Sequence, residues 1–261
     1  MQNTAYTLPR RPRTAAGTRP PPPREERVSH HALTSGVCAL VLALAAPAQA
    51  TWSIVAVDPR TREVGSAGAS CTPYVAGIVA LVPGHGVIVA QARSNAAARR
   101  RGAELLRRGG APGATVAAIS HPSFDARFEE QQYGVASLDF FERPSAFTGT
   151  STQAAAGQRL APGVAVQGNM LTGLDVLTAT MRAFQQAAGR PLAKRLLRAL
   201  EAGAATGGDR RCGAQTAQSA YLVVARPGNA PGRPAVSHVI AAQRKGGPNP
   251  VHLLRRVVLN D

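Results

Sequence analysis

The sequence predicts a mixed α+β domain in which two antiparallel sheets face each other and helices lie outside them. Three observations lead to this prediction. Paired strands fill residues 51–91, helical blocks follow at 96–119 and 174–203, and further strands lie between and after these blocks. The sequence contains no internal repeat. We therefore expect residues 51–261 to form a single domain.

Two strand pairs open this region. Thr51–Val57 has period-two alternation, and Glu63–Ser70 returns as its partner after an Asp-Pro turn. Ile78–Val82 and Val87–Gln91 form a second pair around a Pro-Gly turn. We expect these four strands to make an antiparallel sheet.

The first helical block contains two short helices. Ser94 or Asn95 caps a helix predicted over Ala96–Arg108, and a Gly-Gly pair ends that helix. A second helix is predicted over Pro112–Ile119, because proline is favoured in the first turn of a helix.

The second helical block has a clearer apolar period. Its large apolar residues fall on two helical faces, with Pro191 at the start of the second helix and Gly203 at its end. These residues are Leu174, Leu177, Met181 and Phe184, followed by Leu192, Leu196 and Leu200. The remaining predicted strands are Tyr133–Leu138, Ala146–Thr148, Val164–Gln167, Tyr221–Ala225 and Val236–Ala242.

Residues 1–50 are predicted to be an export leader. Met1–Arg27 is rich in Pro and Arg and lacks apolar periodicity, so we expect it to be disordered. Ala32–Ala46 is an uncharged apolar stretch that is short for a membrane span, and Ala48-Gln49-Ala50 matches a signal-peptidase site. We expect cleavage before Thr51, a periplasmic or secreted product, and no membrane span after processing.

The net charge raises the question of a nucleic-acid partner. The formal charge is +16, but all 30 basic residues except Lys194 and Lys245 are arginine, which is typical of GC-rich genomes. The aromatic residues that stack on bases are few, with one Trp, four Tyr and six Phe. We therefore favour a small-molecule or peptide-like substrate over nucleic acid, and a homo-oligomer stays open.

Common catalytic and metal-binding motifs are missing from the sequence. It has no G-x-S-x-G elbow, no Walker A loop, and no Cys or His pairs at metal-ligand spacing. We therefore expect no metal and no cofactor. Cys71 and Cys212 remain after removal of the leader, and the sequence leaves open whether they form a disulfide.

The predicted cleavage site gives the most informative coincidence. Cleavage before Thr51 leaves a threonine with a free α-amine at the head of a strand. The hydroxyl of such a residue can act as a nucleophile, and its own amine, with an ordinary pKa of about 7.7–8.0, can act as the base. Thr51 is therefore the candidate catalytic residue.

Seven sequence blocks between residues 51 and 242 form a recognisable set. They are Thr51–Pro59, Ala69-Ser70, Val89–Ala92 with Asn95, Phe147–Gly149, Ala165–Leu171, Gly207–Arg211 and Gln218–Ala220. Together they resemble one uncharacterised bacterial family, the domain of unknown function 1028. The family is grouped with the N-terminal nucleophile (Ntn) hydrolases. The resemblance implies a four-layer αββα sandwich of two antiparallel sheets flanked by helices, and by analogy amide-bond hydrolysis.

The sequence departs from the family pattern in two places. Cys212 stands where the Gly-Asp-Arg-Arg block usually continues with glycine, and Arg244-Lys245 stands where an acidic stretch is common. The first departure bears on the candidate site. The second bears on an edge or an assembly contact.

Asn169 and Gly168 are the candidates for stabilising an oxyanion. The side-chain amide of Asn169 supplies a donor, and Gly168 permits a close approach of the backbone. The alternative is that the two residues simply form a turn.

Four further residues are candidates for binding. Ser70 could hydrogen-bond the α-amine of Thr51, and Gln91 could line the same opening. Asp209 could orient the α-amine or hold Arg210. The alternatives are ordinary strand-end residues for the first two and an ion pair at a helix terminus for the last two.

We expect an exported Ntn-type hydrolase that acts on an amide or peptide-like bond. The first alternative is a non-catalytic envelope protein that keeps the fold and holds a cell-wall fragment or another small ligand. The second is a basic protein that binds anionic polymers through its arginines.

Overall fold

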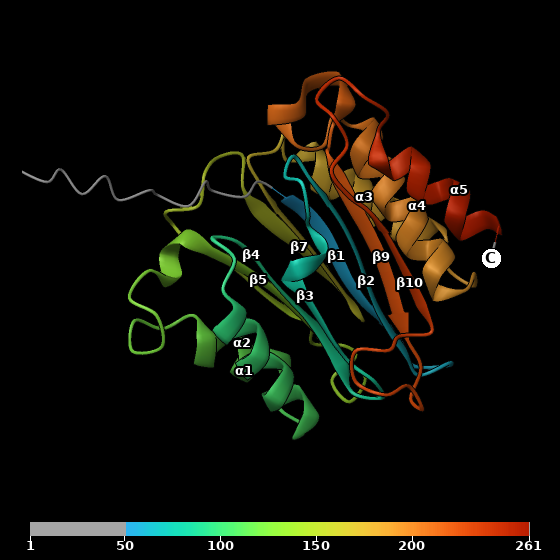
Figure 1. Ribbon diagram of the computed structural model, residues 1–261. Coiled ribbons are helices and arrows are strands. Elements are labelled where there is room, and N and C mark those ends of the chain that lie inside the picture. Colours follow the sequence, from blue (N-terminus) through green and yellow to red (C-terminus); the bar gives the residue numbers. More distant parts are fainter. Residues whose placement is uncertain (1–50, 261) are drawn as a thin grey trace, which may run out of the picture. The chain divides into compact units, whose positions relative to one another are not determined.

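The computed structural model describes residues 51–260, and the leader and signal peptide predicted for residues 1–50 lie outside this range. A six-stranded antiparallel sheet contains the head of the described chain, in the order β10-β9-β2-β1-β8-β7 (Figure 1). Its strands are β1 (Thr51–Asp58), β2 (Glu63–Ser70), β7 (Gly157–Ala161), β8 (Val164–Asn169), β9 (Ser219–Ala225) and β10 (Val236–Ile240). β1 is a central strand. It lies between its hairpin partner β2 and β8, which is far away in the sequence.

A second sheet has four antiparallel strands in the order β3-β4-β5-β6. They are β3 (Val79–Val82), β4 (Gly86–Ala92), β5 (Gln131–Ser137) and β6 (Ser145–Thr148). The prediction that the first four strands form one sheet is wrong. The chain leaves β2, passes through the 3₁₀ helix η1 (Ala76–Ile78) and starts the other sheet at β3, so that the two hairpins lie in different sheets.

The two sheets contact each other through β1 with β4 and β5, and through β8 with β5. Helices α1 (Ala96–Arg107) and α2 (Pro112–Ile119) pack on the four-stranded sheet. Helices α3 (Asp175–Gln186), α4 (Leu192–Ala205) and α5 (Pro250–Asn260) pack on the six-stranded sheet (Figure 1). The predicted mixed α+β class with two antiparallel sheets is confirmed.

The predicted helices start close to where the observed helices start. The predicted end of α4 differs from the observed end. Asn95 caps α1, since its Oδ1 accepts a hydrogen bond from the N–H of Ala98 at 2.9 Å. Gly203 was expected to end α4, yet α4 continues to Ala205. A Cβ at position 203 would lie 2.5 Å from Nε1 of Trp52, so this glycine is needed for close packing of α4 on β1.

The space between the sheets has two chemically different ends. At one end, an apolar cluster joins both sheets and includes Val55, Val57, Val64, Val87, Val89 and Val223. Tyr221 belongs to this cluster, where burial raises the pKa of its hydroxyl although Oγ of Ser66 lies 2.7 Å away. At the other end the inward-facing side chains are polar, and they are described below.

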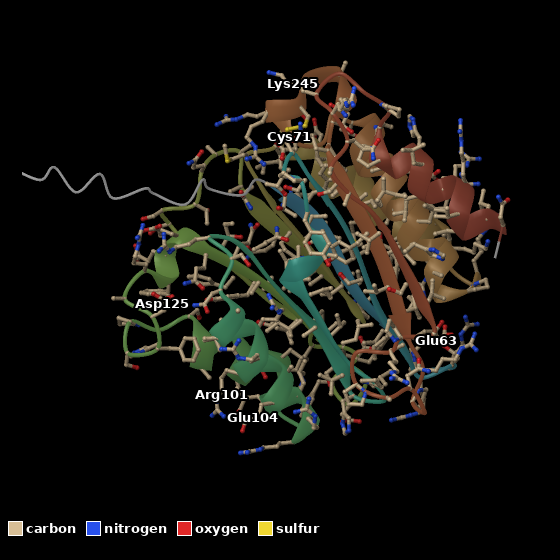
Figure 2. The ribbon with its side chains drawn as sticks, viewed as in Figure 1. Glu63, Cys71, Arg101, Glu104, Asp125 and Lys245 are labelled. Atoms are coloured by element: carbon tan, nitrogen blue, oxygen red, sulfur yellow. A yellow bond between two sulfur atoms is a disulfide. The ribbon has the colours of Figure 1, made fainter. Side chains whose placement is uncertain are left out.

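A disulfide between Cys71 and Cys212 lies at the polar end (Figure 2). Cys71 directly follows β2, and Cys212 lies in the 3₁₀ helix η3 (Arg210–Gln215), with a Cα–Cα distance of 5.6 Å. The bond therefore ties the end of a central strand to a segment 141 residues further along the chain. Within residues 51–260, no helix has the length and apolar character needed to cross a membrane.

Candidate functional site

The head of β1 lies in a row of polar residues that crosses four strands. Thr51 pairs with Asn169 of β8, and the register between β1 and β2, continued by one residue, places Ser70 on its other side. Ser70 in turn pairs with Ser219 of β9. We call Asn169, Thr51, Ser70 and Ser219 the polar row. It brings together three of the candidate residues from segments that are far apart in the sequence.

The side chains of the polar row face the four-stranded sheet. Neighbouring side chains alternate across a strand, and Trp52 packs in the cluster beneath α3 and α4, so Thr51 faces the other way. All four residues of the row are buried. Among the described residues, Oγ1 of Thr51 and Oγ of Ser219 have no hydrogen-bond partner, whereas Oγ of Ser70 accepts from Oγ1 of Thr72 at 3.0 Å.

Gln91 reaches the polar row from the opposite sheet. Its Nε2 lies 3.4 Å from the carbonyl oxygen of Thr51 and donates to Oε1 of Gln132 at 2.8 Å. Its Oε1 accepts from Oγ of Ser53 at 2.5 Å. Gln91 is fully buried, so these hydrogen bonds replace the water that its amide loses.

Gln132 of β5 is the centre of the hydrogen-bond network. Its Nε2 donates to the carbonyl oxygen of Gly168 at 2.9 Å and to Oγ1 of Thr148 at 2.8 Å. Its Oε1 accepts from Nδ2 of Asn169 at 3.2 Å in addition to the bond from Gln91. Gln132 therefore fixes the orientation of the Asn169 amide and leaves the second Nδ2 hydrogen for another acceptor.

Gln167 extends the network along β8. Its Nε2 donates to Oγ of Ser53 at 2.6 Å and to the Ser53 carbonyl oxygen at 3.2 Å. Its Oε1 is buried without a partner among the described residues and lies over Gly134, where a Cβ would come within 2.0 Å of it. The glycine in β5 thus makes room for the amide. We call Ser53, Gln91, Gln132, Gln167 and Asn169 the amide cluster.

The backbone is unusual next to two of the candidate residues. Ala92, which follows Gln91, has φ of 65°, and Met170, which follows Asn169, has φ of 51°. Residues other than glycine, asparagine and aspartate rarely adopt this left-handed conformation, and such outliers concentrate at functional sites. Both outliers flank the amide cluster, one from each sheet.

Gly168 and Arg210 have surroundings that fit structural roles. Gly168 lies inside the sheet between Trp52 and Gly157, and a Cβ there would lie 2.9 Å from Cδ1 of Leu171. Arg210 has an exposed side chain, while its N–H donates to the Met170 carbonyl oxygen at 3.1 Å. Gly168 therefore allows Leu171 to pack closely against β8, and Arg210 contributes a backbone hydrogen bond to Met170.

Asp209 is fully buried and holds Arg211 rather than Arg210. Its Oδ2 lies 2.8 Å from a guanidinium nitrogen of Arg211 and accepts from the N–H of Cys71 at 2.7 Å. Its Oδ1 accepts from the backbone N–H of Arg211 at 3.1 Å. The carboxylate thus joins the disulfide and the end of β2 to η3, beside the polar row.

The side chains placed around Thr51 are hydroxyls and amides, which do not titrate near neutral pH. They can donate and accept hydrogen bonds but cannot take a proton from a nucleophile. Among residues 51–260, no group of three or more His, Cys, Asp and Glu side chains could hold a metal ion. Among the described residues, the carboxylate beside the polar row, that of Asp209, is already paired with Arg211.

Sequence reasoning missed Ser53, Gln132, Gln167 and Ser219. A signal was present in the sequence for two of them, Ser53 and Gln167. Ser53 shares its strand face with Thr51, and Gln167 shares its strand face with Asn169, at a spacing of two residues. The contact of Gln132 with these residues depends on how the sheets stack, which no local pattern encodes.

Comparison with known proteins identifies relatives over most of the chain. The model of a family of unknown function, DUF1028, matches residues 51–245. The crystal structure of protein SPO2555 from Silicibacter pomeroyi, also assigned to DUF1028, is similar with a TM-score of 0.68 and 27% sequence identity. The similarity covers 81% of this chain and 88% of that chain. No curated protein matches this chain.

Proposed function

Since this chain belongs to the DUF1028 family, whose function is unknown, we propose that it is an exported Ntn-type hydrolase of an amide or peptide-like bond. The proposed nucleophile is Thr51, released at the N-terminus by cleavage after Ala50. The proposed location is the periplasm or the exterior of the cell.

The arrangement of the layers supports this proposal. The two sheets contact each other, α1 and α2 pack on one of them, and α3, α4 and α5 pack on the other. We interpret this as the four-layer αββα sandwich of the Ntn hydrolases. Fold alone does not establish activity, so the argument depends on the site.

One observation carries the proposal: the Thr51 hydroxyl is buried at the head of a central strand, and its oxygen has no hydrogen-bond partner among the described residues. A buried unpaired hydroxyl costs about 1–3 kcal/mol, so a fold that keeps one without a function would be penalised. The Asn169 amide stands beside it, oriented by Gln132. The left-handed residues Ala92 and Met170 flank the same place.

The proposed reaction needs no other base than the α-amine. Cleavage after Ala50 converts the peptide nitrogen of Thr51 into an amine that can accept the proton of Oγ1 as the oxygen attacks the substrate carbonyl carbon. The second Nδ2 hydrogen of Asn169 would stabilise the oxyanion. The amine then returns the proton to the leaving nitrogen, and water hydrolyses the resulting ester on Thr51.

An envelope binding protein that keeps the fold is the second candidate. The saturated Asp209–Arg211 pair favours it, because this carboxylate has no remaining role in orienting an amine. In that case the polar row would bind a small ligand through hydroxyls and amides without reacting with it.

The test uses the exported protein and an electrophilic probe for amide hydrolases. N-terminal sequencing is expected to find Thr51 first. Thr51→Ser should keep part of the labelling, whereas Thr51→Ala and a form with one extra residue before Thr51 should fall by about 10²–10⁴-fold. Labelling of Thr51→Ala or of the extended form at the wild-type rate would exclude the nucleophile and favour the binding protein.

A further inference from the structure

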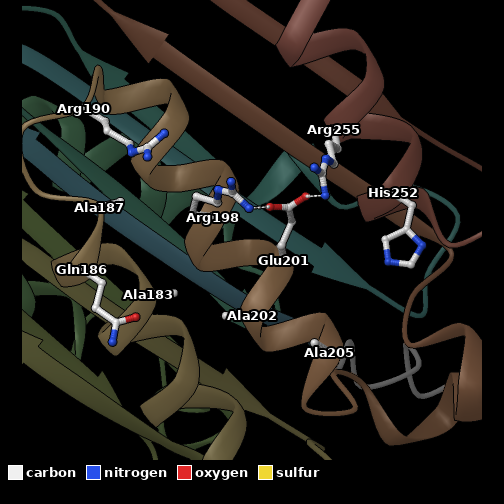
Figure 3. A pocket seen from close by; sticks show the side chains of 10 residues that line it. All are labelled: Ala183, Gln186, Ala187, Arg190, Arg198, Glu201, Ala202, Ala205, His252 and Arg255. Carbon is white, nitrogen blue, oxygen red and sulfur yellow. Dashed lines mark ion pairs between the residues drawn. The ribbon is translucent and has the colours of Figure 1, made fainter.

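A groove runs over α4 on the helical side of the molecule, away from the space between the sheets. Helix α4 packs between α3 and α5, and its outward face forms the floor of the groove (Figure 3). The floor consists of small residues from α3, its C-cap and α4: Ala183, Ala187, Ala202 and Ala205. Gln186 of α3 also lines the groove, and the small side chains of the floor leave room for a bulky group (Figure 3).

Charged side chains stand around this floor. Arg190 comes from the α3–α4 connection, Arg198 and Glu201 from α4, and Arg255 from α5 (Figure 3). His252 of α5 lines the same groove. Three separate segments thus bring guanidinium groups to one place.

Among the described residues that line the groove, Glu201 alone carries a carboxylate, and it pairs with two of the three guanidinium groups. Glu201 lies 3.6 Å from Arg198 and 3.4 Å from Arg255, and these are long ion pairs. Arg190 has no acidic partner among residues 51–260. Three positive charges against one negative charge leave two positive charges uncompensated. The Glu201 side chain is only 16% exposed, while those of Arg198 and Arg255 are half exposed.

We propose that this groove binds a dianionic phosphate-type group, such as a phosphomonoester. The two uncompensated charges match a dianion, and guanidinium groups bind phosphate oxygens in a bidentate manner. The alanine floor would admit the tetrahedral group, and Arg190, Arg198 and Arg255, which line the same groove, would contact it. The site lies on a different face from the polar row and does not depend on the hydrolase proposal.

The first test is calorimetric titration of the full-length chain with inorganic phosphate at about 0.1 M ionic strength, where the Debye length is about 10 Å. We expect saturable binding at one site. Arg255→Gln should weaken it by about fivefold or more, since hydrogen bonds to charged groups contribute about 1.5–3 kcal/mol in buried sites and less at the surface. Glu201→Gln should strengthen it by about threefold, because it removes the competing carboxylate.

The matched control is Arg107→Gln on α1. Arg107 is exposed on the helical layer of the other sheet, and its replacement lowers the net charge by the same amount. Binding in this variant should stay within about twofold of wild type, because charges beyond the Debye length are screened. Equal losses in Arg107→Gln and Arg255→Gln, or weaker binding in Glu201→Gln, would overturn the proposal.

A second titration distinguishes the sources of the phosphate group. Phosphatidylcholine vesicles that contain phosphatidic acid present a phosphomonoester at a membrane surface. If the protein binds these vesicles but not inorganic phosphate, and Arg255→Gln abolishes the vesicle binding, the ligand is a lipid headgroup. If it binds inorganic phosphate but not the vesicles, the ligand is a soluble phosphate compound. Failure of both probes to bind would overturn the proposal.

Discussion

The two ends of the space between the sheets are built from the same strands but held together differently. At one end, β1 and β4 contribute Val55, Val57, Val87 and Val89 to an apolar cluster. At the other end, the same two strands contribute Thr51, Ser53 and Gln91. All of these side chains are buried, so the difference lies in chemistry and not in exposure.

This difference separates two kinds of packing. Apolar burial is non-directional and tolerates small shifts of one sheet over the other. A buried amide is tolerated only when its hydrogen bonds have good geometry, so the amide cluster fixes the relative position of the sheets at its own end. The amide donors therefore lie at the end where the Thr51 hydroxyl has no hydrogen-bond partner among the described residues.

The largest expected effect concerns the covalent link at the polar end. The Cys71–Cys212 disulfide closes a chain segment of 141 residues, and loss of such a link costs about 2–5 kcal/mol. Replacing both cysteines with serine should therefore lower the free energy of unfolding by about 4 kcal/mol, measured by urea denaturation. If the polar end were as stable without a covalent link as the apolar end, the free energy of unfolding would hardly change.

A reductant provides the control for this prediction. Dithiothreitol should destabilise the wild type by a similar amount and leave the double serine variant unchanged. A similar loss in both proteins would point to an effect unrelated to the disulfide.

Gln132→Leu should have the next largest effect. Leucine has nearly the same size but leaves Nε2 of Gln91, Nδ2 of Asn169 and the Gly168 carbonyl oxygen without this partner. Unpaired buried groups cost about 1–3 kcal/mol each, and partial relaxation should bring the total to about 3 kcal/mol. Val89→Ala at the apolar end is the comparison, and the cavity it leaves should lower the free energy of unfolding by about 2 kcal/mol. Should Gln132→Leu cost less than Val89→Ala in thermal unfolding, the amide cluster does not hold the sheets in place.

The smallest expected effects come from exchanging isosteric residues between the two ends. Val89→Thr places a hydroxyl in the apolar cluster and should cost about 1–3 kcal/mol. Thr51→Val removes a hydroxyl that has no hydrogen-bond partner among residues 51–260 and should be neutral or slightly stabilising. Chemical denaturation of both variants measures this contrast. A large loss of stability in Thr51→Val would show that the hydroxyl has a structural role.

The fold could be predicted wherever neighbouring residues in the chain decide it. The hairpin of β1 and β2 follows from alternation around a turn, and α2 follows from its first-turn proline. Strand β7 was missed because Gly157–Ala161 is a half-exposed edge strand with no apolar period. Helix α5 was missed although Val251, Leu254 and Val258 have helical spacing. Which hairpin joins which sheet depends on pairings between distant segments, and these leave no local pattern.

The candidate site was predictable in part for the same reason. The positions of Ser70 and Asn169 beside Thr51 follow from strand ends that the sequence marks. The partners Gln132 and Gln167 were missed because a polar residue with period two ordinarily indicates the solvent face of a strand. A buried amide and an exposed one have the same period, and only the second sheet makes the difference.

The position of β1 in the middle of its sheet also bears on when the site appears during folding. Its partner β2 is adjacent in the chain. Strands β8 and β9, which complete the polar row, lie in the second half of the domain sequence. Pairings of such high contact order form slowly, because a long loop must close before any contact compensates its entropy. We expect a refolding chain to regain helical circular dichroism before it regains any function of the polar row.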